Sequence, residues 1–239
     1  MNSELAHKVL NFLNITVKAV MRASEFNQIG KLPKYFRAAD CVPIHQHDLE
    51  MWPGYLTQTR LCADGIFLNV DTAARFIQKQ TVLDFIRQMV GAGRSKDQIS
   101  KIFDSSNQDT ARKTIITTYN TKSYQVDGLD WDQSPRTHVF DAPHKKDKTK
   151  VVRMSMIDYL KEHYGVTLAD PNQPLLFVNF RDTRFYFPPE CCRDASLPEN
   201  FTSDSRKMKD LQDFKISDPT KRMDRICALI SKIMNSGEF

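Results

Sequence analysis

The sequence predicts an α+β fold, and three patterns along the chain indicate it. Apolar residues in 4–23 recur about every 3.6 positions, as they do on one face of a helix. Residues 114–119 form a β-branched run that a turn connects to a second short run, which is typical of a hairpin. Ser155, three residues before Asp158, begins a helical segment between two groups of strands. We therefore expect helices and strands in one chain, with a β-rich module between residues 112 and 195.

The first half of the chain is expected to mix helix and hairpin. Asp64-Gly65 is a turn dipeptide between two apolar runs and predicts the hairpin. Asp71 or Thr72 is a suitable N-cap for a short helix after it, and Gly91 ends a later one. The predicted elements are a helix at 4–23, a connector without clear period at 24–50, hairpin strands at 56–59 and 66–70, and helices at 71–76, 81–90 and 95–103.

The second half is expected to be richer in strands. Gly165 ends the helix that Ser155 begins. Cys191 and Cys192 are expected to be buried as small apolar groups. The predicted elements are a hairpin at 114–119 and 123–126, apolar patches at 139–140 and 151–152, a helix at 155–164, strands at 175–178 and 185–187, and helices at 203–214 and 219–234.

Composition limits the possible functions without selecting one. The chain has 239 residues, a formal net charge of +5 and 41% hydrophobic residues, so overall disorder is not expected. A mildly basic chain permits an anionic partner but does not require one. No run approaches the roughly 20 apolar residues of a membrane span, and no signal peptide is recognised. Five cysteines without framework spacing suit a reducing compartment, so we expect a cytoplasmic or nuclear protein without a membrane partner.

Motifs for catalysis and metal binding are missing from the sequence. It contains no Gly-rich phosphate loop, no G-x-S-x-G and no H-E-x-x-H. Cys41, His45 and His47 are close together, but their C-x3-H-x-H spacing fits no common zinc site. We therefore expect no catalytic residues, no metal and no cofactor.

Residues 119–191 combine aromatic side chains with a basic run. Bases stack on aromatic rings and phosphates need cations, so this mixture indicates single-stranded nucleic acid as a ligand. The lysines either contact phosphates or form a solvated loop. The basic residues are Lys145, Lys146, Lys148, Lys150 and Arg153.

Four motifs in this stretch resemble, in order, the PAZ domain of the Piwi branch of Argonaute proteins. Asp130-Trp131-Asp132-Gln133 is the element that points to this branch, and Trp52-Pro53-Gly54-Tyr55 and Thr81–Asp84 resemble its first linker. The four motifs are Tyr119–Pro135, Met156–Tyr164, Asp170–Leu176 and Phe187–Cys191.

The resemblance implies a fold and a domain arrangement. The fold would be an open OB-like β-barrel with a β-hairpin–α insertion, preceded by a helix and a linker hairpin. Residues 1–80 would end the N-terminal region and hold the first linker, 81–195 would form the PAZ domain, and 196–239 would begin the second linker. Residues 236–239 resemble a cloning remnant. The MID and PIWI domains of the full-length protein would be partners, and any slicing activity would belong to the PIWI domain.

The resemblance also implies that the chain binds the 3′ end of a single-stranded small guide RNA, carrying a 2′-O-methyl group. Three tyrosines would donate hydrogen bonds to phosphate, one phenylalanine would stack on the terminal base, and another would close the pocket floor. Two cations would contact the backbone. In that order, the candidate residues are Tyr124, Tyr159 and Tyr164, Phe140, Phe187, and Lys122 and Arg112.

Two other functions are weighed against guide binding. Some PAZ-like domains act as protein-interaction modules, and the apolar stripe of 219–234 would suit a partner helix. An RNA-processing nuclease that carries PAZ fits less well, since no nuclease carboxylate set is present. Trp131 is expected to be structural, and Leu160 stands where relatives often carry an aromatic residue.

Overall fold

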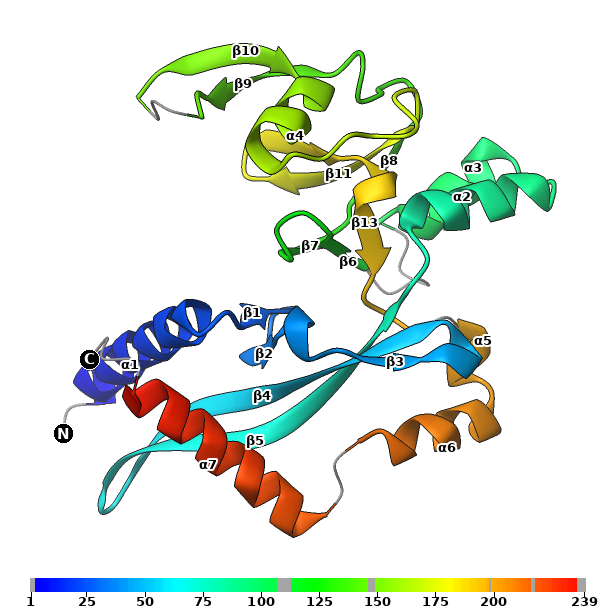
Figure 1. The fold of residues 1–239 in the computed structure, drawn as a ribbon. Helices are drawn as coiled ribbons and strands as arrows, with labels where there is room; N and C mark the ends of the chain where they lie inside the picture. Colours follow the sequence, from blue (N-terminus) through cyan, green and yellow to red (C-terminus); the bar gives the residue numbers. More distant parts are fainter. Residues whose placement is uncertain (1–2, 107–112, 146–148, 198, 216–217, 236–239) are drawn as a thin grey trace. The chain divides into compact units, whose positions relative to one another are not determined.

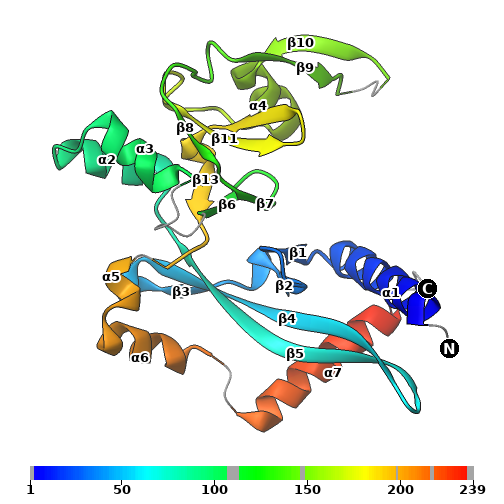
Figure 2. The same ribbon diagram turned by 180° about the vertical axis from the view of Figure 1, so that it is seen from behind.

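The computed structural model describes residues 3–106, 113–145, 149–197, 199–215 and 218–235. The chain forms two compact units, shown in Figure 1 and from behind in Figure 2. The first unit combines residues 1–77 with 197–239, and the second spans 78–196. Among the described helices, none is long and apolar enough to cross a membrane.

The first unit is built on a long two-stranded ribbon, which both views show as two strands running side by side. Strand β4 (Leu49–Cys62) pairs with β5 (Gly65–Gln78). Three short strands extend this sheet in the order β1-β2-β4-β3. They are β1 (Asn27–Gln28), β2 (Lys34–Phe36) and β3 (Val42–Ile44).

The predicted hairpin is present but much longer, and the short helix predicted at 71–76 is wrong. Strand β5 continues through this stretch and buries Phe76 at 7% exposure. Asp71 Oδ1 accepts a hydrogen bond from the Thr72 backbone N–H at 2.7 Å and pairs with Arg222 at 2.6 Å. The Asp71 side chain therefore makes a local hydrogen bond within β5 and caps no helix. The segment is a strand because its pairing with β4 outweighs its local preference for a helix.

Residues 24–50 are also more ordered than predicted. They contain β1, β2, β3 and two short 3-10 turns, Ala38–Asp40 and His45–His47. Strands of two or three residues are too short to show a period in sequence. Phe36 and Ile44 are nonetheless 1% exposed, so this segment supplies core residues.

Helices α1 (Ser3–Ala23) and α7 (Pro219–Asn235) confirm the first and last predicted helices. Helix α7 packs within the unit through Leu229, which is 3% exposed and joins a cluster with Met21 and Tyr35. Met223 and Ile230 of the predicted apolar stripe stay 61% and 47% exposed. The first unit also contains α5 (Glu199–Thr202) and α6 (Ser205–Asp213).

The second unit begins with two capped helices that match the predictions. In α2 (Val82–Gly91), Thr81 and Asp84 form a capping box with two 3.1 Å bonds. In α3 (Lys96–Phe103), Ser95 and Gln98 form another. Reciprocal caps of this kind satisfy N–H groups that a helix start leaves without partners.

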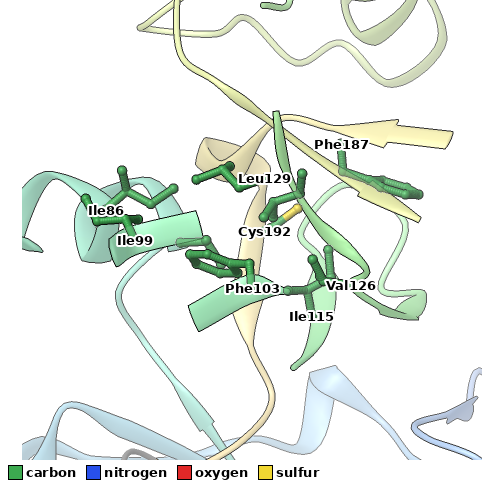
Figure 3. Close-up of a cluster of buried hydrophobic side chains, with 10 residues drawn as sticks. Ile86, Ile99, Phe103, Ile115, Val126, Leu129, Phe187 and Cys192 are labelled. Atoms are coloured by element: carbon green, nitrogen blue, oxygen red, sulfur yellow. The ribbon is translucent and has the colours of Figure 1, made fainter. Parts of the chain in front are cut away.

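An open barrel follows, made of two three-stranded antiparallel sheets. Their strand orders are β13-β6-β7 and β12-β11-β8. Figure 3 shows side chains from both sheets meeting those of α2 and α3, with Phe187 among them. The strands are β6 (Thr114–Thr117), β7 (Ser123–Gln125), β8 (Gly128–Asp130), β11 (Leu175–Phe180), β12 (Thr183–Phe187) and β13 (Cys192–Asp194).

A hairpin and a helix are inserted into this barrel, as predicted. Strands β9 (Val139–Pro143) and β10 (Val151–Ser155) pair in antiparallel register. Helix α4 (Met156–Tyr164) follows directly, and Ser155 caps it by accepting from the Asp158 backbone N–H at 3.2 Å. The insertion has its own core around Met156, Leu160 and Leu175.

Candidate functional site

A pocket of about 700 Å³ lies between the core of the barrel and the core of the insertion. It gathers every candidate residue that the structure describes, in one place. Their contact with RNA stays a prediction. They are Lys122, Tyr124, Phe140, Tyr159, Tyr164 and Phe187.

Two tyrosines from α4 form the insertion side of the pocket. Residues five apart point about 140° away from each other on an ideal helix, so their convergence needs a helix end. Tyr164 is the last residue of α4, and Gly165 follows in a left-handed conformation with φ 69°. The rings of Tyr159 and Tyr164 consequently meet edge to face, with centroids 5.8 Å apart.

The barrel side is formed by Tyr124 and Phe187. Their ring centroids lie 4.4 Å apart. Phe187 is 7% exposed and belongs to the barrel core, so its position is fixed by packing. Tyr124 lies on β7 opposite Ile115 and is half-buried. A ring held in this way needs little ordering when a ligand arrives.

Phe140 lies on β9, at the base of the inserted hairpin. Its ring stacks with His138 at 5.5 Å and meets Tyr159 edge to face at 5.2 Å. His138 also lines the pocket and lies 4.4 Å from Tyr186. The three side chains His138, Phe140 and Tyr159 therefore form a continuous aromatic wall.

Burial raises the pKa of two phenol groups in the pocket. Burial raises the pKa of Tyr159 to about 12, and the hydrogen bond with Tyr164 adds to the rise. Burial raises the pKa of Tyr124 too, against the opposing effect of a hydrogen bond with Asn120. At neutral pH these hydroxyls are neutral, so they can donate hydrogen bonds to an anion without repelling it.

The basic residues are less concentrated at the pocket than the aromatic ones. Lys122 and Arg184 both line it. Lys145 instead donates to the carbonyl of Glu162 at the end of α4. Arg112, Lys146 and Lys148 lie outside the described residues.

Several further lining residues were not predicted from the sequence, among them Tyr119, His138 and Tyr186. Tyr119 packs on Tyr164 at 4.6 Å, and burial raises the pKa of its phenol well above the usual range. The hydroxyl of Tyr186 donates to Asp130 at 3.3 Å. Side chains alternate between the two faces of a strand, so Tyr186 and Phe187 lie on opposite faces of β12. Both line the pocket nonetheless, which strand periodicity alone does not predict.

Trp131 is structural, as predicted. Its indole N–H donates to Ser100 Oγ at 2.9 Å and it packs against the barrel core. Cys191 and Cys192 are 3% and 0% exposed, which confirms their predicted burial. Leu160, at 1% exposure, fills the insertion core.

Among the described residues, no three His, Cys, Asp or Glu side chains gather as metal ligands would. His47 instead pairs with Asp210 at 3.3 Å and meets Phe201 edge to face. The pocket itself offers neutral donors and rings, with the cations Lys122 and Arg184 and one carboxylate, Asp141. Its rings and donors suit the binding of a ligand with aromatic and anionic parts.

Known proteins are similar to this chain in sequence. Piwi-like protein Ago3 of Bombyx mori is 29% identical over 244 residues, covering 96% of this chain and 25% of that protein. Piwi-like protein 1 of Danio rerio is 30% identical over 241 residues, covering 96% and 26%. The chain thus spans about a quarter of the length of the curated relatives it matches.

The structure and the family agree with that similarity. The crystal structure of Drosophila Piwi superposes with a TM-score of 0.63 at 23% identity, covering 97% of this chain and 27% of that one. This likeness supports the predicted fold class. Residues 83–216, more than half of the chain, match the PAZ domain family. The chain therefore belongs to the PAZ domain family and is similar to Piwi-type Argonaute proteins over nearly all its length.

Proposed function

We propose that this chain binds the 3′ end of a single-stranded small guide RNA in the pocket between barrel and insertion. The observation that carries the proposal is the convergence of the pocket's tyrosine hydroxyls and aromatic rings from two separate cores. A chain terminus suits such a pocket, because its last nucleotide would meet the barrel side and the insertion side at once.

Phosphate is the proposed ligand of the tyrosine hydroxyls. Tyr124, Tyr159 and Tyr164 come from a strand and a helix that face each other across the pocket. Hydrogen bonds from neutral hydroxyls to a charged phosphate contribute about 1.5–3 kcal/mol each. Lys122 supplies a nearby positive charge.

The terminal base and sugar would occupy the apolar part of the pocket. Phe140 would stack on the base, and stacking of this kind contributes about 1–3 kcal/mol. Phe187 lines the pocket with Met156 and Pro188, and these three residues would form its floor. An apolar floor favours a 2′-O-methyl group over a hydroxyl, because a hydroxyl there would lose its hydrogen bonds to water.

Binding, rather than cleavage, is the proposed contribution of this chain. The pocket is lined mainly by tyrosines and phenylalanines, whose hydroxyls and rings suit binding. We expect the guide's remaining length, and any slicing, to involve the MID and PIWI domains of a full-length protein. The compartment where this happens stays the cytoplasm or nucleus expected from sequence.

Titration with RNAs that differ only at the 3′ end tests the proposal. Short RNAs ending in 2′-O-methyl, 2′-hydroxyl and 3′-phosphate should bind in that order of decreasing affinity. A 3′-phosphate adds charge and bulk where the pocket closes, so it should bind weakest. Equal affinity for all three ends would remove the basis for end recognition.

The salt dependence of the same titration gives a second check. Few phosphates would be neutralised, so the affinity should fall only mildly between 50 and about 200 mM salt. A steep fall would indicate non-specific binding along the RNA backbone instead. The 2′-O-methyl and 2′-hydroxyl RNAs carry equal charge, so their slopes should match.

A further inference from the structure

One face of the β11–β12 hairpin carries apolar side chains outward from the barrel core to the exposed tip. Side chains alternate between faces, so directly paired residues two apart share one face. The exposed fraction rises along this face from 7% at Phe187 to 48% at Phe185 and 58% at Phe180. The pairs that share it are Leu176 with Phe187, Val178 with Phe185, and Phe180 with Thr183.

The two outer phenylalanines have no role in the core. Buried rings stabilise a fold, whereas rings left about half exposed contribute little. A hairpin tip normally carries polar or glycine residues. Phe180 and Phe185 both line the pocket, and they are diagonal neighbours across the hairpin, within reach of one ligand. Their positions indicate a surface that continues the pocket outward.

Two arginines lie on this hairpin, Arg181 beside Phe180 and Arg184 on the opposite face beside Phe177. The Arg181 guanidinium lies 5.4 Å from the ring centroid of Phe180. Arg181 adopts φ 54°, a left-handed conformation that favours glycine or asparagine, so another residue would turn this tip at lower cost. Arg184 lies 4.2 Å from the ring centroid of Phe177 and donates to Asn179 at 3.1 Å. Rings beside guanidinium groups match a single strand, whose bases stack while its phosphates pair with cations.

We propose that Phe180 and Phe185 form an outer stacking platform for bases upstream of the terminal nucleotide, with Arg181 beside the intervening phosphate. The proposal rests on the proposed function, because the strand must enter the pocket by its 3′ end. RNA is the chosen occupant for two reasons. The platform is continuous with the pocket, and the nearby cations complement a polyanion.

An abasic scan with matched variants tests the platform. Six-nucleotide RNAs with a 2′-O-methyl end would carry one abasic ribose at each upstream position in turn. For the wild type, one or two of these changes should weaken binding about 5- to 150-fold, the range expected for one lost stacking contact. The Phe180→Ala variant should bind the intact RNA about 5- to 150-fold more weakly than the wild type does. The same abasic changes should not weaken binding to this variant any further.

Controls separate stacking from other causes. Phe180→Tyr keeps a ring and should retain wild-type affinity, whereas Phe180→Leu keeps apolar bulk without a ring and should behave as Phe180→Ala. Phe12→Ala removes a phenylalanine of similar exposure, 67%, from the first unit and should change nothing. Phe185→Ala repeats the test at the neighbouring ring.

The outcomes distinguish the platform from the pocket. If Phe180→Ala and Phe185→Ala bind every RNA as the wild type does, while 3′-end discrimination persists, the platform is overturned and the pocket stands. If the wild type fails to discriminate between 3′ ends, both are overturned. Abasic effects that vanish in Phe180→Ala, with end discrimination intact, support the platform.

Discussion

The two units place similar aromatic residues in opposite environments. In the first unit, Tyr35 and Phe36 are 2% and 1% exposed, and Phe26 meets Tyr55 edge to face at 5.5 Å inside the unit. In the second unit, rings from the barrel and the insertion line an open pocket instead. The pocket of the second unit lies between the core of the barrel and the core of the insertion. The described residues of the first unit also form two core clusters, but Phe26, Tyr35 and Phe76 lie inside them.

Composition alone therefore does not separate binding rings from core rings. Trp52, at 4% exposure, bonds to Glu50 and takes part in no pocket described above, although a Trp is a common ligand contact. The comparison predicts that core rings control stability and pocket rings control RNA affinity. The experiments below separate these two effects.

The largest expected effect is on stability in the first unit. Phe36→Ala should lower the free energy of unfolding by about 3–5 kcal/mol, because it removes a fully buried ring and leaves a cavity. Denaturant unfolding followed by circular dichroism measures it. Phe185→Ala, at a half-exposed position, should change the same quantity by less than about 1 kcal/mol. Similar losses of unfolding free energy in the two variants would contradict the difference in burial between Phe36 and Phe185.

Phe140→Ala should weaken binding of a 2′-O-methyl-ended RNA by about 1–3 kcal/mol, since the stacking ring is lost. Fluorescence anisotropy with a labelled RNA measures the affinity, and a melting curve checks that the variant is folded. Phe140→Tyr should restore most of the affinity because it keeps the ring. If Phe140→Ala binds RNA normally, the terminal base does not stack there.

Tyr159→Phe and Tyr164→Phe should each weaken RNA binding by about 1 kcal/mol or more, because each loses one hydroxyl that donates to phosphate. Tyr55→Phe is the matched control. Its hydroxyl donates to the Arg225 carbonyl at 3.2 Å within the first unit, so RNA affinity should not change. Equal behaviour of all three variants would refute the phosphate role.

Alkaline pH should act on stability through the buried phenols. The folded-state pKa of Tyr159 is raised to about 12, above the usual value of about 10. The unfolded state therefore loses its proton first, and stability is retained below pH 10 and declines as the pH rises toward 12. Tyr159→Phe should reduce this decline in urea unfolding measured across that range. An unchanged decline would place its origin in other tyrosines.

Acid should have a smaller effect, through His138. Burial lowers the pKa of its imidazole, against the attraction of Asp130. The unfolded state then binds a proton more readily, so this contribution to stability is present above pH 6.5 and lost as the pH falls through the folded value. His138→Asn should flatten the unfolding free energy between pH 7 and 5. If the unfolding free energy of the variant changes with pH as that of the wild type does, His138 is not the source of the pH dependence.

Local signals in the sequence located most of the helices. Ser155 caps α4 as predicted, and the helices predicted from 81 and 95 are capped by Thr81 and Ser95. The short strands β1, β8 and β13 were not predicted, because two or three residues show no period and long-range pairing defines them. The same pairing turned the predicted helix at 71–76 into part of β5.

The candidate site was predicted to a different extent. Tyr159, Tyr164 and Phe140 were assigned from resemblance to a family, and the structure brings them together. His138 and Tyr186 were missed because their nearness to Phe140 depends on how the insertion packs on the barrel. Arg112, whose position lies outside the described residues, stays a prediction from sequence.

The most direct test of guide-end binding is a crystal structure of this chain with a short RNA whose 3′-terminal nucleotide carries both a bromine on its base and a 2′-O-methyl group. The anomalous signal of bromine locates the terminal base without any need to trace the RNA in the electron density. The account predicts one peak in the pocket, in contact distance of Phe140 and above Phe187. A peak on the β4–β5 ribbon of the first unit, with the pocket empty of RNA, would contradict it.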